Sequence, residues 1–449
     1  MFKWFLTGED KPRIQDDAKI RSMYREMRIK CLSAMIVGYG LYYVLRMTLG
    51  IVKKPMLESG FTPTELGYMG AGMMISIAFG KCMNGFIADR CNVKKIVPLG
   101  LFASAIINII LGFSTAHWVF IVLWFFAGWF QSMGSSPCIV AMSQWFSKSK
   151  LATYVGFYSV AHYLGEGATY LGTVFIVAAL GWHAAFYIPG IFCLLFSVLM
   201  YNFMFDRPEA YGLPSANEFE GETEQEKKEQ QLSTKEAQKA VLLNPFIWIL
   251  ALAAICLGIA RYSIISWGVL FFQEYKGYEL TTAGMIMSLS PIMGGIGTGL
   301  SGIISDKLFR SNHPLTTIIF GFMMLAGIAG MCFFPVAHPI IDCFWISIFG
   351  FGLGVCLCFV GGMLAVDLAP RKASGAAVGV IGLCAYFGAT LQDIVNGFLI
   401  QESEIIVDGV KTYNFDTIMI FWIVSVLIMT LLIIPPLIFR KKHVAAKQA

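Results

Sequence analysis

Twelve long apolar runs constrain this chain more than any other feature of its sequence. Of the 449 residues, 57% are hydrophobic and only 14% are charged, whereas soluble domains carry about 25% charged residues. A helix needs about 20 apolar residues to cross the hydrocarbon core of a bilayer. The sequence therefore predicts an all-α membrane protein with twelve transmembrane helices in a lipid bilayer. The runs cover residues 31–55, 66–87, 96–115, 117–141, 151–178, 183–205, 246–273, 281–304, 314–335, 340–366, 373–399 and 415–439.

Lysine and arginine are distributed unevenly between the two sets of loops. If the N-terminus is cytoplasmic, 26 of the 33 basic residues lie in cytoplasmic segments, and four lie outside, namely Lys53, Lys54, Lys276 and Lys411. Cytoplasmic loops of membrane proteins carry such an excess of basic residues. We therefore expect a multi-pass protein of the plasma (inner) membrane with both termini in the cytoplasm. The net charge of +5 has this topological role and does not indicate nucleic-acid binding.

The longest polar stretch, residues 206–243, divides the chain into two parts with six apolar runs each. We expect an N-terminal six-helix bundle over 1–205, a cytoplasmic linker over 206–243 and a C-terminal six-helix bundle over 244–449. The later part of the linker is rich in Glu, Gln, Lys and Ala, which favours a surface helix. The linker is either a solvated connection or a platform for binding another protein.

A short motif recurs at matching places in the two halves. The segment after the second run reads GFIADR, and the segment after the eighth reads GIISDK, 217 residues later. A glycine lets two membrane helices approach closely. An aspartate at a helix end can pair with a basic residue or with the N-terminus of a neighbouring helix. We predict a cytoplasmic gate at these two copies. It comprises Gly85, Asp89, Arg90, Gly302, Asp306 and Lys307.

Two arginines lie deep in apolar runs at equivalent places. Arg46 and Arg261 each lie 15 residues beyond the start of their run. An arginine at that depth costs about 2.5–3.5 kcal/mol on insertion scales, so both need a partner. A carboxylate from another helix is one possibility. An anionic ligand held by both side chains is the other, and a guanidinium group suits phosphate because it donates two parallel hydrogen bonds.

Several longer stretches resemble one family. The segments GYGLYYVLR, GWFQSMGSSPC, GWHAAFYIPG, SDKLFRSN and LAPRKASGAAVGVIGLCAYFG are together similar to the organophosphate:phosphate antiporters of the major facilitator superfamily. These include glycerol-3-phosphate and hexose-6-phosphate transporters and a related hexose-phosphate sensor. The resemblance implies two pseudosymmetric six-helix bundles around a central cavity, and transport by alternating access.

The resemblance also implies roles for individual residues. In that family the arginines that match Arg46 and Arg261 hold the substrate phosphate. The family's other matching positions around the substrate are Tyr39, Tyr43, Lys81, His162 and Tyr386.

The polar residues around these positions depart from the family pattern. The lysine that usually follows the first arginine is Met47 here, the arginine usual late in the fourth helix is Val140, and the acid usual before the tryptophan of the seventh helix is Ser266. The fifth helix reads YSVAHYLGEG, with Glu166 at a position where the family has no acid. The substrate's identity therefore does not carry over with the arginines.

The remaining polar residues leave alternatives open. Lys81 either lines a cavity or extends its ammonium group to the membrane interface. His162 is either a packing residue or a ligand for a phosphate ester whose ionisation it matches. Glu166 lies one helical turn from His162 and would pair with it, face an arginine or carry a proton. Gln392 and Asp393 are an outer-mouth feature, contacts between helices, or residues with a role in coupling.

Neither a nucleophile–base arrangement, a metal motif nor a nucleotide loop is found in the sequence. GGIGTG at 294–299 lies inside an apolar run, where it predicts close helix contacts. We therefore expect no enzyme activity, cofactor or metal, and a monomer. The leading hypothesis is exchange of a phosphorylated metabolite for inorganic phosphate. Its alternatives are a sugar-phosphate sensor that signals to a kinase, and a proton-coupled organic-anion symporter.

Overall fold

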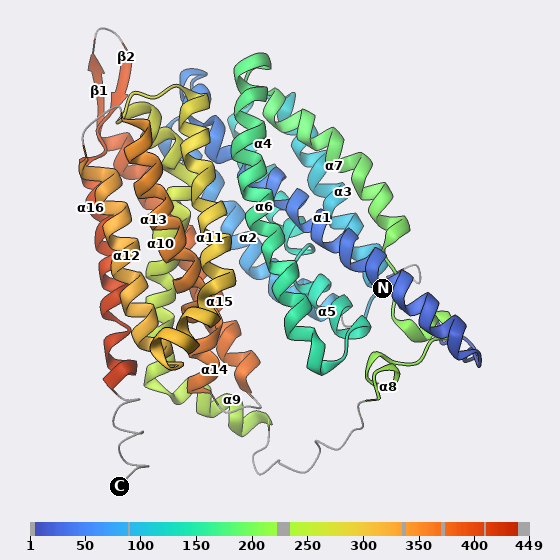
Figure 1. Cartoon of the computed structure of the whole chain (residues 1–449). Helices are drawn as coiled ribbons and strands as arrows, with labels where there is room; N and C mark the ends of the chain where they lie inside the picture. Colours follow the sequence, from blue (N-terminus) through green and yellow to red (C-terminus); the bar gives the residue numbers. More distant parts are fainter. Residues whose placement is uncertain are drawn as a thin grey trace. The chain divides into compact units, whose positions relative to one another are not determined.

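The computed structural model describes residues 5–88, 90–221, 234–334, 338–369, 373–407 and 410–438 (Figure 1). Within these residues twelve helical segments are long and apolar enough to cross a membrane. Each of them overlaps one of the twelve predicted runs, so that prediction is confirmed. In the first half the helices are α1 (Asp17–Glu58), α2 (Pro63–Ala88), α3 (Val93–Gly112), α4 (His117–Ser132), α5 (Ser136–Trp145), α6 (Lys148–Leu180) and α7 (Ala184–Phe203).

The second half begins after the connection that contains η2 (Pro208–Tyr211), α8 (Ala216–Phe219) and α9 (Thr234–Leu243). The surface helix predicted late in the linker corresponds to α9. The membrane helices and the hairpin that follow are α10 (Pro245–Glu274), α11 (Leu280–Phe309), α12 (His313–Phe333), α13 (Pro339–Cys358), η4 (Phe359–Met363), α14 (Leu364–Leu368), α15 (Ser374–Glu402), β1 (Glu404–Val407), β2 (Val410–Tyr413) and α16 (Asp416–Leu431).

Local sequence explains where several helices begin. Asn244 precedes α10, and its side-chain oxygen accepts a hydrogen bond from the Phe246 amide at 3.0 Å. Pro245 then occupies the first helical position, where its missing N–H group is not needed. Asn312 caps α12 in the same way, by accepting from the Leu315 amide, and Pro314 is the second residue of that helix. α4 and α5 together form one span (His117–Trp145) with a break after Ser132, near Gly134 and Pro137.

The chain forms two compact units, and their boundary falls inside helices. One unit contains Met1–Thr48, Ile75–Thr169 and Ala179–Glu229, and the other contains Leu49–Met74, Tyr170–Ala178 and Gln230–Ala449. We call these the N-terminal and C-terminal units. α1, α2 and α6 each pass from one unit to the other along their length. The bounds of the two units differ from the predicted bundles at 1–205 and 244–449. Because the units reflect the contacts of one conformation only, the division into those bundles stays a prediction.

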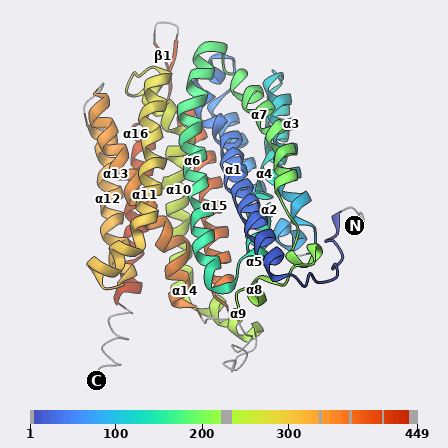
Figure 2. The same cartoon turned by 45° about the vertical axis from the view of Figure 1, so that its right-hand side comes forward.

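Glycines set the closest helix contacts of the C-terminal unit. Gly258 of α10 faces the backbone of Ala385, and Gly388 of α15 faces the backbone of Ile255. Helices α11 and α13, which lie side by side (Figures 1 and 2), meet where Gly354 faces Gly294. A side chain at these positions would overlap backbone atoms, which cannot move aside as a side chain can. The close contacts predicted for 294–299 are confirmed at this place.

Candidate functional site

The first intramembrane arginine lies in a group of aromatic rings in the N-terminal unit. Arg46 of α1 is only 4% exposed. Its guanidinium carbon lies 4.5 Å from the centre of the Tyr43 ring, one turn earlier on the same helix. An aromatic face attracts a cation without neutralising its charge. The burial predicted for Arg46 is therefore present, and an aromatic ring supports its charged group.

The same rings join α1 to α6. The Tyr43 ring lies 5.4 Å from the His162 ring, and the Tyr39 ring stacks on Tyr158 at 4.5 Å. Tyr158 in turn donates a hydrogen bond to the Gly134 carbonyl. The structure thus brings together Tyr39, Tyr43, Arg46 and His162, four of the residues to which the family resemblance gives a role in substrate binding. Tyr158 is the first residue of the stretch YSVAHYLGEG, which departs from the family pattern.

Glu166 lies on α6 one helical turn beyond His162, and it is 3% exposed. A buried carboxylate on this helix adds a titratable group to the unit that holds Arg46. The coupling role of Glu166 stays a prediction. Lys81 of α2 is half-buried, and its backbone carbonyl accepts a hydrogen bond from the Ser136 hydroxyl at 3.0 Å. Both alternatives for the Lys81 side chain stay open.

The second arginine lies in the C-terminal unit, in a comparable setting. Arg261 of α10 is 9% exposed, and its guanidinium carbon lies 5.2 Å from the centre of the Tyr262 ring. The Tyr262 ring lies 6.2 Å from Tyr386 of α15. Each unit therefore contains one buried arginine beside a tyrosine of its own helix.

The described residues of the predicted cytoplasmic gate lie at or within two turns of the ends of α2 and α11. Arg90, Asp306 and Lys307 are exposed, and Asp306 accepts a hydrogen bond from the Ser311 hydroxyl at 2.6 Å. Asp89 lies outside the described residues. The close helix approach predicted at Gly302 is not seen, since among the described residues a Cβ there would meet no atom within 4 Å, and one at Gly85 would make an ordinary contact with Ser136. The gating role itself stays a prediction.

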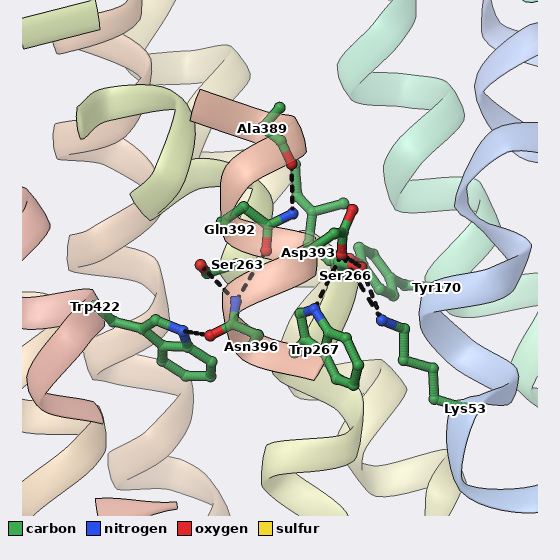
Figure 3. Close-up of polar contacts among 11 residues, drawn as sticks. Lys53, Tyr170, Ser263, Ser266, Trp267, Ala389, Gln392, Asp393, Asn396 and Trp422 are labelled. Carbon is green, nitrogen blue, oxygen red and sulfur yellow. Dashed lines mark hydrogen bonds and ion pairs between the residues drawn. The ribbon is translucent and has the colours of Figure 1, made fainter. Parts of the chain in front are cut away.

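A buried polar cluster in the C-terminal unit was missed by the sequence analysis. Charge counting placed Lys53 with the outside residues, but this side chain is fully buried near the end of α1 (Figure 3). Its ammonium nitrogen donates to the Ser266 hydroxyl at 3.0 Å and lies 3.9 Å from Asp393 Oδ1. The Ser266 hydroxyl donates in turn to Asp393 Oδ1 at 2.7 Å. Ser266 is the position where the family usually has an acid.

Trp267 completes the surroundings of this ion pair. The indole N–H donates to Asp393 Oδ1 at 3.0 Å, and the Lys53 nitrogen lies 3.0 Å from the centre of a Trp267 ring. The signal for this pair was present in the sequence as an aspartate inside an apolar run, since a charged group at that depth needs a partner. The sequence did not indicate which cation that partner is.

The polar residues of α15 next to Asp393 are fixed by hydrogen bonds. Asn396 donates to Ser263 at 3.0 Å and to Gln392 at 2.9 Å, and it accepts from the Trp422 indole at 3.0 Å (Figure 3). These bonds join α15 to α10 and α16. Asp393, which accepts from Ser266 and Trp267 of α10, therefore makes contacts between helices, whereas the hydrogen bonds of Gln392 stay within α15.

The first part of the linker is not a solvated loop. Leu213 and Ala216 are buried, and Glu220 forms ion pairs with Lys150 and, at 2.8 Å, with Arg28 of α1. Partial burial opposes ionisation of Glu220, but the hydrogen bonds from Lys150 and Arg28 outweigh it and hold the pKa of this carboxyl below its usual value. The linker therefore begins as a structured part of the N-terminal unit.

No group of three or more His, Cys, Asp or Glu side chains in the described part of the chain is arranged to hold a metal ion. Comparison with known proteins identifies the family. Residues 35–392 match the family model described as Major Facilitator Superfamily.

The chain belongs to the major facilitator superfamily. It is 31% identical over 399 residues to the glycerol-3-phosphate transporter of Bacillus subtilis (strain 168), a match that covers 86% of this chain and 89% of that protein. It is 32% identical over 401 residues to the membrane sensor protein UhpC of Escherichia coli (strain K12), covering 87% and 90%. These relatives confirm the predicted organophosphate:phosphate antiporter family within the superfamily.

The fold is also that of solved major facilitator structures. A bacterial homologue of the human lysosomal transporter Spinster, solved in an inward-facing and unoccupied conformation, superposes with a TM-score of 0.68. The superposition covers 93% of this chain and 95% of that one, at 14% sequence identity. At this identity the likeness concerns the fold alone, and the predicted major facilitator fold with twelve transmembrane helices is confirmed.

Proposed function

We propose that this protein is a secondary transporter that exchanges a phosphorylated metabolite, such as a sugar phosphate or glycerol phosphate, for inorganic phosphate. It works as a monomer in the plasma (inner) membrane, with both termini in the cytoplasm. The observation that carries the proposal is the burial of Arg46 in the aromatic group of α1 and α6, with Arg261 in a comparable setting on α10. The relationship to a glycerol-3-phosphate transporter supports the same substrate class.

The arginines supply the chemistry that phosphate recognition needs. A guanidinium group stays charged at every physiological pH and donates in a planar fork that matches two phosphate oxygens. Tyr39, Tyr43, Lys81, His162 and Tyr386 line the substrate around this clamp in the proposal. A phosphate-like group held by both arginines favours closure around the substrate. Each reorientation then carries an anion, which makes exchange the natural mode of transport.

The direct test is a counterflow assay in proteoliposomes. Purified protein is reconstituted with internal phosphate, and uptake of labelled glycerol 3-phosphate, hexose 6-phosphates and carboxylates is measured. We expect uptake of at least one phosphate ester that depends on internal phosphate, and no uptake of carboxylates. Failure of every phosphate ester to enter phosphate-loaded vesicles would contradict the proposal.

A sensor is the second candidate, because the chain is also 32% identical to a membrane sensor protein and its polar residues near the arginines depart from the transporter pattern. A sensor binds its ligand without moving it. Binding of a sugar phosphate to the purified protein, together with absent counterflow, would favour this candidate over the transporter.

A further inference from the structure

The buried pair of Lys53 and Asp393 lies where segments of α1, α2 and α6 join the C-terminal unit. Lys53 belongs to the part of α1 that starts at Leu49, and Asp393 belongs to α15. Lys53 lies five residues before the end of α1 at Glu58, which is about 8 Å of helix. The pair is therefore close to the ends of α1 and α2 that their connecting loop joins.

Glycines bring these segments into backbone contact with the C-terminal helices. A Cβ at Gly50 of α1 would lie 2.7 Å from the Ile265 carbonyl oxygen of α10. On α2, a Cβ at Gly67 would lie 3.2 Å from the Gly397 Cα, and one at Gly70 would collide with the Asp393 carboxylate. α1 and α2 thus meet α10 and α15 at positions that only glycine allows.

α6 makes the third contact of this kind. The Tyr170 hydroxyl donates to the Ile265 carbonyl of α10 at 2.9 Å. A Cβ at Gly284 of α11 would lie 3.0 Å from the Tyr170 carbonyl oxygen. Each of the segments of α1, α2 and α6 that belong to the C-terminal unit is therefore in close contact with α10, α11 or α15.

We infer that Lys53 and Asp393, bridged by Ser266, form the charged latch that closes this end of the transporter and separates whenever the end opens. The inference rests on the proposed transport function. In alternating access the two halves rock against each other, so contacts between residues of 1–205 and residues of 244–449 at either end must break once per cycle. This pair is such a contact, and the proposed orientation places it at the non-cytoplasmic end.

An ion pair suits a contact that must open. The gain from joining two charges in a dry site is largely offset by the loss of their hydration. Water that enters on opening hydrates both groups again, so opening carries a small net penalty. Two apolar side chains would instead stabilise the closed state, because opening would expose their apolar surface to water. Removal of one charge alone leaves the other buried without its partner, which favours opening.

The chain contains a matched control. Lys276 and Asp342 are also almost fully buried, with the Lys276 nitrogen 3.1 Å from Asp342 Oδ1 and 3.0 Å from the Phe334 carbonyl oxygen. The Tyr278 hydroxyl donates to the same carboxylate at 2.6 Å. All four residues lie within 244–449, so no step of alternating access needs to break this pair.

The test measures opening directly and does not use transport. Spin labels are attached to cysteines at Ser59, in the loop between α1 and α2, and at Ile406 of β1, in a chain whose 11 native cysteines are replaced. Distances between the labels are measured by pulsed electron resonance in lipid nanodiscs without substrate. Ser59 and Ile406 are both exposed, so labels there leave the buried contacts intact.

Lys53→Met should increase the fraction of molecules with long label distances by at least about tenfold, because Asp393 loses its partner. The double variant Lys53→Met/Asp393→Leu should return that fraction to the parent value or below it. It contains no orphaned charge, so it provides a folded counterpart if the single variant is unstable. Lys276→Met should lower the melting temperature and leave the distances unchanged.

Unchanged distances in Lys53→Met, or equal opening in Lys276→Met, would overturn the latch. A double variant as open as Lys53→Met would do the same. The distance measurement needs neither substrate nor phosphate, so it tests the latch independently of transport. If Lys53→Met lengthens the label distances but the parent protein shows no counterflow, the proposed function is disproved and the latch stands. If the parent protein shows counterflow but Lys53→Met leaves the label distances unchanged, the proposed function stands and the latch is disproved.

Discussion

Arg46 and Tyr43 lie one turn apart on α1, with the guanidinium carbon 4.5 Å from the ring centre. The same ring lies 5.4 Å from His162 of α6. Tyr43 therefore supports the charge of Arg46 and links it to the second helix of the candidate site. The aromatic ring of Tyr43 makes both of these contacts.

Tyr43→Phe should consequently keep phosphate exchange close to normal, whereas Tyr43→Leu should weaken apparent substrate affinity. A cation–π contact contributes about 0.5–2 kcal/mol, which corresponds to a change in affinity of about 2- to 30-fold. Counterflow measured over a range of substrate concentrations separates the two variants. A large loss in Tyr43→Phe would show that the hydroxyl contacts the substrate.

Arg46→Lys and Arg261→Lys should each reduce exchange by at least about tenfold. Lysine keeps the charge but loses the planar fork, and a hydrogen bond to a charged group contributes about 1.5–3 kcal/mol. Size-exclusion profiles and membrane insertion should match the parent protein. Near-normal exchange by either purified variant would contradict the phosphate clamp.

Glu166→Gln distinguishes exchange from proton coupling. In an exchanger the Glu166 carboxylate only alters the field around Arg46, so the variant should retain exchange with a shift in affinity of less than about tenfold. Uptake by the parent protein should require internal phosphate and survive an uncoupler. Uncoupler-sensitive uptake into phosphate-free vesicles, lost in Glu166→Gln, would instead identify a proton-coupled symporter.

Gly67→Ala should destabilise the closed end that Lys53 and Asp393 hold. The new Cβ would overlap the Asp393 carbonyl oxygen and approach the Gly397 Cα, and both are backbone atoms. Gly172→Ala on α6 is the matched control, because among the described residues nothing lies within 4 Å of a Cβ there. The spin-label distances should lengthen in Gly67→Ala and stay unchanged in Gly172→Ala.

The orientation can be tested with single cysteines in a chain otherwise free of them. A cysteine at Glu218, in the linker, should react with a membrane-impermeant thiol reagent only from the cytoplasmic side. A cysteine at Lys411, in β2, should react only from outside. Both positions are exposed, so burial would not explain a lack of reaction. Labelling of Glu218→Cys from outside intact cells would show that the proposed orientation is wrong.

The sequence by itself determined the twelve membrane helices and the burial of Arg46 and Arg261. Hydropathy suffices for the helices because a chain in lipid must satisfy its backbone hydrogen bonds within each segment. Hydropathy also suffices for the arginines, because a charged side chain in the middle of an apolar run is far from both ends of its helix. The helix starts at Asn244 and Asn312 are equally local, since a cap bonds within its own turn.

Only the tertiary structure decided the partners of those charges. Lys53 and Asp393 are 340 residues apart in the sequence, and a contact at that separation leaves no periodic pattern along the chain. Counting charges placed Lys53 outside the membrane because the rule considers distance from a helix end and ignores neighbouring helices. The choice between a solvated lysine and a buried one depends on whether a second helix brings a carboxylate to it, and that is a property of packing alone.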